Sequence, residues 1–114
     1  MQAFDLLKDK TFDNTVVKKV ANLKTEQLGV DTYYFQPGQV LAYHKHPGSD
    51  QVFFFLEGEG KFYLEENGNE QVINVHPGMV VLAPADVLHK LENTGLGPLV
   101  ATQCTKLPAT IESK

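Results

Sequence analysis

Cysteine is almost absent from this sequence of 114 residues, and the single Cys104 excludes an intramolecular disulfide. One free thiol is typical of proteins from a reducing cytosol. Positively charged residues are also few, because 10 Lys and Arg stand against 14 Asp and Glu, which gives a formal net charge of −4. Nucleic acids and anionic membrane surfaces select basic faces, so we expect neither as a partner.

Long hydrophobic runs are missing as well. No apolar stretch approaches the roughly 18–20 residues that a membrane-spanning helix needs. The N-terminal residues 1–10 (MQAFDLLKDK) have two aspartates within their apolar pattern and no basic region before it, so no signal peptide is expected. These absences predict a cytoplasmic protein that does not associate with membranes.

Helical periodicity is confined to residues 3–9 (AFDLLKD), enough for one or two turns. Elsewhere, strand-length apolar runs alternate with Gly, Pro and Asn turns at a spacing of about eight to twelve residues. The expected strands are 15–23, 27–35, 39–46, 51–57, 61–66, 70–75, 79–83, 87–93 and 99–104. Asn67-Gly68 predicts a tight hairpin, because both central residues of a type I′ turn have positive φ. This pattern predicts an all-β sandwich or barrel, in a single domain over residues 1–114.

The strand expected at 51–57 (QVFFFLE) is apolar on both faces, because alternate residues point to opposite sides of a sheet. A second sheet would cover one face, and we expect a partner subunit to cover the other. The N-terminal run at 15–23 has no local strand to pair with. We therefore expect a homodimer in which the N-terminal segment 1–25 contacts the second copy.

Two spaced motifs contain most of the histidines. The first spans residues 38–58 and reads G-x5-H-x-H-x4-Q-x6-G, and the second spans residues 78–93 and reads G-x5-P-x-D-x2-H-x3-N. Together they resemble the two motifs of the cupin superfamily, G-x5-H-x-H-x3,4-E-x6-G and G-x5-P-x-G-x2-H-x3-N. The spacing matches at every anchor across about half of the chain. Two positions depart from the family, because Gln51 replaces the usual Glu and Asp86 the usual Gly.

The resemblance implies the all-β cupin fold, a double-stranded β-helix or jelly-roll barrel in a single domain. Small cupins of this kind commonly form dimers with exchanged N-terminal strands, which agrees with the expected role of segment 1–25. The resemblance also implies a metal site whose ligands are His44, His46, the residue at position 51 and His89.

The spacing of the first two histidines has a physical reason. Residues two apart on a strand point the same way, so His44 and His46 can both face a barrel interior, with Cβ atoms about 7 Å apart. The resemblance implies that His89 closes the site from a distant strand. Three imidazoles favour one divalent ion of Fe, Ni, Zn, Mn or Cu over Mg or Ca, and three or four protein ligands leave positions open for water or substrate.

Position 51 leaves alternatives open. Gln51 offers a neutral carbonyl oxygen, so one interpretation makes it a weak metal ligand that leaves the ion's charge uncompensated. In another, its amide binds a metal-bound water or the substrate, and the histidines alone hold the ion. A third assigns the ligand position, or a general base, to Asp50, because the family motif also permits three intervening residues.

Aromatic side chains are candidates for the wall of a substrate pocket. Phe53 and Phe55 share the side of Gln51 on the expected strand, although packing in the core is the default expectation for both. Tyr34 and Tyr63 are further candidates whose direction the sequence does not fix. His76 precedes a Pro-Gly turn outside both motifs, and we interpret it as a turn or surface residue.

Two functions of different class agree with these features. The first is a metal-dependent small-molecule enzyme of the dioxygenase, isomerase, decarboxylase or lyase type that the superfamily contains. The second is a non-catalytic cupin that binds a metal or metabolite for sensing or storage. Both have a small-molecule ligand as partner, and the three histidines with open positions favour the enzyme.

Overall fold

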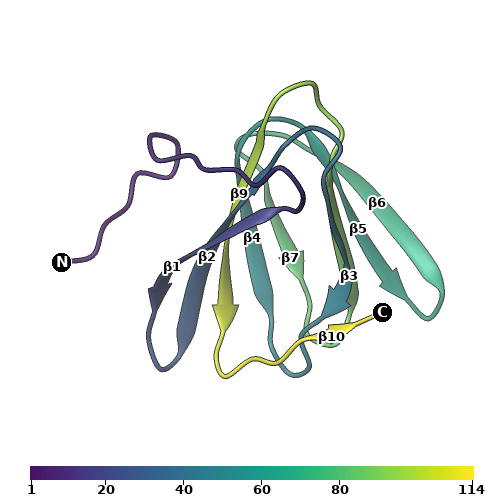
Figure 1. Cartoon of the computed structure of the whole chain (residues 1–114). Coiled ribbons are helices and arrows are strands. Elements are labelled where there is room, and N and C mark those ends of the chain that lie inside the picture. Colours follow the sequence, from purple (N-terminus) through teal and green to yellow (C-terminus); the bar gives the residue numbers. More distant parts are fainter.

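Ten β-strands form the regular structure of the computed structural model, which describes residues 1–114 (Figure 1). Their bounds are β1 Lys18–Lys24, β2 Leu28–Phe35, β3 Val40–Lys45, β4 Gln51–Glu57, β5 Gly60–Glu66, β6 Asn69–Val75, β7 Val80–Ala83, β8 Leu88–Asn93, β9 Leu99–Lys106 and β10 Glu112–Ser113. All nine expected strands are present within a few residues of their predicted ends. The short strand β10 was not expected. The structure contains no helix with the length and apolar character needed to span a membrane.

The strands form two antiparallel sheets that face each other (Figure 1). One sheet has the order β1-β2-β9-β4-β7 and the other the order β10-β3-β8-β5-β6. Apart from the β1–β2 and β5–β6 pairs, consecutive strands lie in opposite sheets, as in a jelly roll, and the predicted double-stranded β-helix is confirmed. This topology brings the two histidine motifs, on β3 and β8, into adjacent strands of one sheet.

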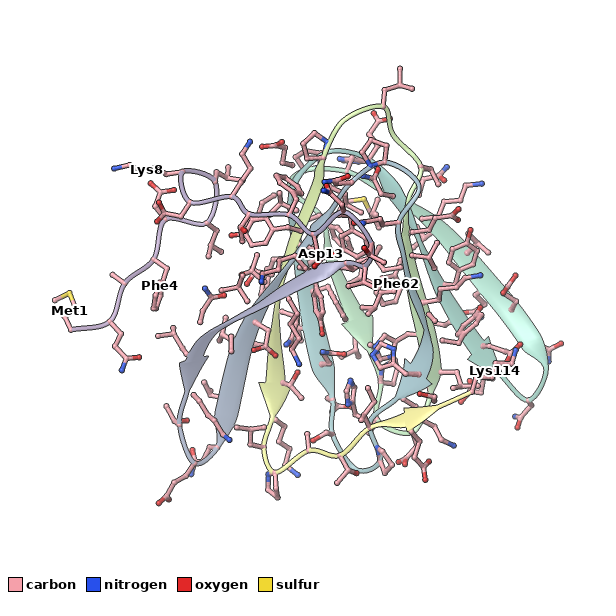
Figure 2. The ribbon with its side chains drawn as sticks, viewed as in Figure 1. Met1, Phe4, Lys8, Asp13, Phe62 and Lys114 are labelled. Carbon is pink, nitrogen blue, oxygen red and sulfur yellow. The ribbon has the colours of Figure 1, made fainter.

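The N-terminal segment differs from its prediction. Within residues 3–9 only residues 6–9 form a turn, closed by the bond from Asp9 N to Asp5 O (3.1 Å), and no helix is present there. Strand β1 pairs with β2 of the same chain, from Lys18 opposite Tyr34 to Lys24 opposite Gly29. The premise that the 15–23 run lacks a local partner is therefore wrong. Met1 extends away from the two sheets, whereas Asp13 lies over them (Figure 2) and its carbonyl accepts a hydrogen bond from Gln39 Nε2 at 2.9 Å.

The hydrophobic core lies between the sheets, where alternate residues of each strand point inward. Figure 2 places Phe62 of β5 in this layer. Phe53 and Phe55 of β4 also belong to the core cluster, whereas Phe54 between them is 44% exposed on the outer face. Core packing, the default expectation for the two inward phenylalanines, is therefore confirmed.

Two turns show why particular residues occupy them. Asn67 and Gly68 both have positive φ, 53° and 79°, and join β5 to β6 in the predicted tight hairpin. Asp86 has a φ of 67°, in the left-handed region that glycine favours. The cupin motif has Gly at this position for that conformational reason, and Asp is among the few other residues that tolerate it.

Candidate metal site

The three histidines of the motifs converge at one point inside the barrel. His44 on β3 lies directly opposite His89 on β8, and His46 follows at the end of β3. One nitrogen from each of these three rings lies within 4.8 Å of the other two. Their ring centroids are 4.2 Å apart for His44 and His89, 5.1 Å for His44 and His46, and 5.6 Å for His46 and His89. We call these residues the histidine triad.

Backbone carbonyls hold the outer nitrogen of each ring. His44 Nδ1 lies 2.8 Å from Ala42 O, and His89 Nδ1 lies 3.5 Å from Val87 O, in both cases the residue two positions earlier. His46 Nδ1 lies 2.9 Å from the carbonyl of Thr110, near the other end of the chain. Because a carbonyl only accepts, each Nδ1 carries the proton, and each Nε2 is left with a free lone pair. This arrangement is typical of histidines that bind metals.

Three buried acceptor atoms in the site have no hydrogen-bond partner. They are Nε2 of His46, Nε2 of His89 and Oε1 of Gln51. Most buried polar atoms in proteins are paired, because an unpaired one loses its hydration without compensation. A cation between them would satisfy all three acceptors at once. The donor set therefore fits a metal ion of the borderline transition series.

Burial keeps the imidazoles in the form that binds metals. Desolvation lowers the pKa of His44 below its usual 6.5, and the effect of the nearby His46 is in the same direction. Desolvation, followed by the proximity of His44, lowers the pKa of His89 to about 3. A metal binds the neutral ring, so neither residue has to lose a proton near neutral pH.

A polar network lies on the sheet that faces the triad. Gln51 on β4 is directly opposite Thr105 on β9, whose hydroxyl donates to the side-chain oxygen of Gln103. The amide of Gln103 in turn donates to Asp31 Oδ2 at 2.8 Å. Lys19 Nζ lies 3.6 Å from the same carboxylate oxygen. Strand register brings these residues of β1, β2, β4 and β9 onto one inward face.

A cavity of about 260 Å³ opens beside this network. Its lining includes Lys19, Asp31, Tyr33, His46, Gln51 and Gln103. A ligand in this cavity would meet one histidine of the triad, the free oxygen of Gln51, one ammonium and one carboxylate. The volume corresponds to a small molecule.

Aromatic rings cover the triad on its core side. Phe53 lies 5.8 Å from the His89 ring in an edge-to-face arrangement, and Phe62 stacks on it at 6.0 Å with 3° between the planes. Phe55 contacts Phe53 and Phe62 and belongs to the core. Of the two phenylalanines proposed for the pocket wall, only Phe53 has a contact with the triad. This apolar floor explains the desolvation of His89.

The structure moves Tyr34 and Tyr63 out of the expected pocket wall. Tyr63 is opposite Lys90 on β8, outside the barrel, and donates to Glu92 at 2.6 Å. Tyr34 faces the N-terminal segment and donates to Leu6 O at 2.9 Å. Strand alternation places Tyr33 inward instead, where it lines the cavity.

Asp50 does not join the cluster either. Its carboxylate accepts a hydrogen bond from Ala85 N at 2.8 Å and so holds the 84–86 turn. The side chain is exposed, in contrast to the buried Gln51 beside it. The interpretation of Asp50 as a ligand or base is therefore not supported by its position. His76 is exposed at its turn, as predicted.

Several residues of the site had no signal in the sequence. The Thr110 carbonyl is a backbone group, which a side-chain motif cannot reveal. Asp31, Gln103 and Lys19 meet only through the register of β1, β2 and β9. The sequence indicated only that each of them could occupy an inward-facing position in the alternation of its strand.

The family model described as "Cupin domain" matches residues 32–103, more than half of the chain and all of both motifs. The chain belongs to the cupin family. Its departures from the family motifs are accordingly specific features of this cupin: the neutral Gln51 in the site and Asp86 in the turn that precedes β8.

Two named relatives have moderate similarity to this cupin. The oxalate-binding protein of Thermotoga maritima is 34% identical over 59 residues, which are 52% of this chain and 46% of that protein. Germin-like protein 1 of Brassica napus is 31% identical over 77 residues, covering 65% of this chain and 37% of its own length. This cupin thus spans about half, or less, of the length of these relatives.

Solved structures share the fold over nearly the whole chain. TT1209 from Thermus thermophilus has a TM-score of 0.84 at 29% identity, covering 93% of this chain and 97% of that one. A protein with a double-stranded β-helix domain from Klebsiella pneumoniae has a TM-score of 0.89 at 19% identity, with 99% and 96% covered. Oxalate decarboxylase from Bacillus subtilis has a TM-score of 0.78 at 20% identity over 95% of this chain and 30% of that chain. The last two similarities describe the fold alone.

Proposed function

We propose that this cupin binds one divalent transition metal ion at the histidine triad, with the amide oxygen of Gln51 as a fourth ligand. The observation that carries the proposal is the set of buried acceptor atoms without partners, on His46, His89 and Gln51. Imidazole ligands select Fe, Ni, Zn, Mn or Cu over Mg or Ca, and four protein ligands or fewer leave positions for a small molecule. When bound, the ion would polarise an oxygen atom of that molecule and acidify bound water.

The charge of the site favours an anionic ligand. All four proposed donor groups are neutral, so they do not offset the charge of a divalent ion. Lys19 brings a further positive charge to the cavity, which Asp31 offsets at 3.6 Å. An anion with two oxygen donors would neutralise the site and occupy the open positions. The oxalate-binding protein of Thermotoga maritima is named for such a ligand. We therefore propose oxalate, or a similarly small dicarboxylate, as the ligand class.

Calorimetric titration tests this proposal. Oxalate is expected to bind the metal-loaded protein at one site and the metal-free protein not at all, whereas the uncharged analogue oxamide binds neither form. Lys19→Ala is expected to weaken oxalate binding about tenfold, or about 1.4 kcal/mol, without reducing metal affinity. Lys18→Ala is the matched control, because Lys18 is opposite Tyr34 in the β1–β2 pair and so on the outer face. Equal effects of the two substitutions, or equal binding of oxamide, would contradict the proposal.

A catalytic role for the same site is favoured by one observation. Asp31 places a carboxylate in the cavity wall, where Gln103 orients it through a hydrogen bond of 2.8 Å. A positioned carboxylate can transfer a proton to or from a bound ligand. If this cupin is a metal-dependent small-molecule enzyme that turns over a dicarboxylate, Asp31→Asn is expected to abolish consumption of the ¹³C-labelled substrate. The metal content of the protein is expected to stay unchanged. Saturable binding without consumption, in air and without oxygen, would assign the non-catalytic binding function instead.

We also propose that this cupin is a homodimer. The outer face of the β4–β7 pair is apolar, with Phe54 44%, Val80 59% and Leu82 50% exposed in the single chain. A patch of this kind on one sheet is typical of an interface between protein chains. Light scattering at micromolar concentration is expected to give the mass of two chains, and Phe54→Lys that of one. A monomer mass for the unaltered protein would contradict the proposal.

A further inference from the structure

His46 differs from the other two histidines of the triad in what orients it. The carbonyls that hold His44 and His89 lie two residues earlier, on Ala42 of β3 and on Val87 just ahead of β8, so the local chain of each histidine fixes its ring. The carbonyl that holds His46 belongs to Thr110, 64 residues away. His46 also lies one residue past the end of β3. The direction of its Nε2 lone pair thus depends on a segment outside both cupin motifs.

That segment, residues 107–114, is called the C-terminal strap here. It leaves β9 in one sheet, crosses the open end of the barrel and ends as β10 at the edge of the other sheet (Figure 1). Leu107 N donates to Gln27 O at 2.9 Å, and the buried hydroxyl of Ser49 donates to the Lys106 carbonyl at 2.5 Å. These bonds fix the strap where it leaves β9.

The other end of the strap is fixed on β3 itself. Glu112 and Ser113 pair with Lys45 and His44. Lys114 N donates to the Tyr43 carbonyl at 3.2 Å, and Lys114 forms an ion pair of 2.6 Å with Glu65.

Between its two attachments the strap has exposed side chains, including Ile111 at 64%. Thr110 lies in this bridge, so both attachments position its carbonyl.

The strap also forms part of the cavity. Leu107, Ala109, Thr110 and Ile111 line the same 260 Å³ space as His46 and Gln51. The carbonyl that orients one histidine therefore belongs to a segment that a bound ligand would touch. In metal sites, groups that hold the ligating histidines typically change metal affinity by 10–100-fold when they are removed.

We infer that the C-terminal strap is a positioning element of the metal site: the Thr110 carbonyl fixes the tautomer and direction of His46, and the bonds that fix the strap to β3 and β9 set the affinity of the triad for its ion. The inference rests on the proposed metal binding. Thr110 acts through His46 and touches no metal, so its effect is confined to one of the three imidazoles.

The first experiment compares Co²⁺ affinity by calorimetry in the unaltered chain and in a variant that lacks residues 109–114. The shortened chain is expected to bind Co²⁺ at least about tenfold more weakly. A second variant combines Ala109→Gly, Thr110→Gly and Ile111→Gly, which keeps β10 but makes the chain between the two attachments more flexible, and it is expected to weaken Co²⁺ binding as well. Leu96→Gly loosens an exposed loop whose side chain has no part in the site and is the matched control.

A double-mutant cycle separates positioning from a general structural effect. In a His46→Ala background, the triple substitution Ala109→Gly, Thr110→Gly and Ile111→Gly, which keeps the β10 pairing beside His44, is expected to cause no further loss of Co²⁺ affinity. In a His89→Ala background, the same triple substitution is expected to weaken Co²⁺ binding by as large a factor as in the unaltered chain. A tenfold loss in both backgrounds, or no loss in the unaltered chain, would overturn the inference.

Histidine side-chain ¹⁵N spectra of the metal-free protein give a readout that does not need the ion. The unaltered chain is expected to show His46 with its proton on Nδ1 alone, and the shortened chain to show a mixture of tautomers. If the unaltered chain binds no Co²⁺, the proposed metal function fails, and these spectra still decide what the strap does. An unchanged His46 signal after removal of the strap would overturn the inference in either case.

Discussion

His44 and His89 face each other directly across β3 and β8, with 4.2 Å between their ring centroids. The antiparallel register makes this pairing a property of the backbone. Burial lowers the pKa of both rings, and the nearby His44 lowers the pKa of His89 further. The same contact that prepares the pair to hold a cation makes the metal-free protein sensitive to acid.

The metal-free protein is therefore expected to lose stability as pH falls. The pKa of His89 is about 3 in the folded state and 6.5 ordinarily, so between these values the unfolded chain binds a proton that the folded chain does not. The free energy of unfolding consequently rises with pH across this range, by at most about 1.4 kcal/mol per pH unit for this group. Urea unfolding at pH 4.5 and pH 7 measures the difference.

His89→Gln is expected to reduce that pH dependence, and His76→Gln, at an exposed turn, to leave it unchanged. The lowered pKa of His44 contributes in the same direction and explains any dependence that is left. Equal stability of the unaltered protein at the two pH values would show that the burial of His89 has no energetic consequence.

Gln51→Glu is expected to tighten metal binding. The substitution restores the carboxylate of the family motif beside the histidines, and a negative charge within about 4 Å of a cation stabilises it by several kcal/mol at protein-like screening. We expect the dissociation constant for Zn²⁺ to fall at least about tenfold. Gln71→Glu adds the same charge at an exposed position of β6 and is the control. An unchanged constant for Gln51→Glu would place Gln51 outside the set of ligands.

Gly58→Ala is expected to destabilise the fold more than Gly38→Ala. Both glycines have a φ of 84°, so alanine costs about 1 kcal/mol of backbone strain at each. A Cβ atom at Gly58 would lie 2.1 Å from the Pro98 carbonyl oxygen, whereas nothing lies within 4 Å at Gly38. The overlap should add about 1–3 kcal/mol, seen as a lower midpoint in chemical unfolding. Equal losses would mean that the β8–β9 loop moves away without cost.

The sequence predicted the strands and the histidine triad because both follow from local periodicity and from spacing. Alternation on β3 determines that His44 and His46 point in the same direction. The resemblance to the second cupin motif added His89 to the predicted site. The same alternation could not decide between Tyr33 and Tyr34, because adjacent residues of a strand point to opposite faces. That choice depends on which face of β2 meets the second sheet.

Contacts that depend on strand register or on the backbone could not be predicted. The Asp31–Gln103 bond requires β2 and β9 to pair in one register, although 72 positions separate the two residues. Strand β10 has two residues, too few for a periodic pattern. The premise that the 15–23 run lacks a local partner failed for a related reason, because the partner of β1 is the next strand of the same chain.

The most direct test of the account is a metal titration of four single variants, His44→Ala, His46→Ala, His89→Ala and His76→Ala. Zn²⁺ binding to the metal-free protein, followed by calorimetry, is expected to show one site in the unaltered chain. Each substitution in the triad should weaken it at least about tenfold, and His76→Ala should not change it. A site that survives the loss of His89, or that requires His76, would contradict the account.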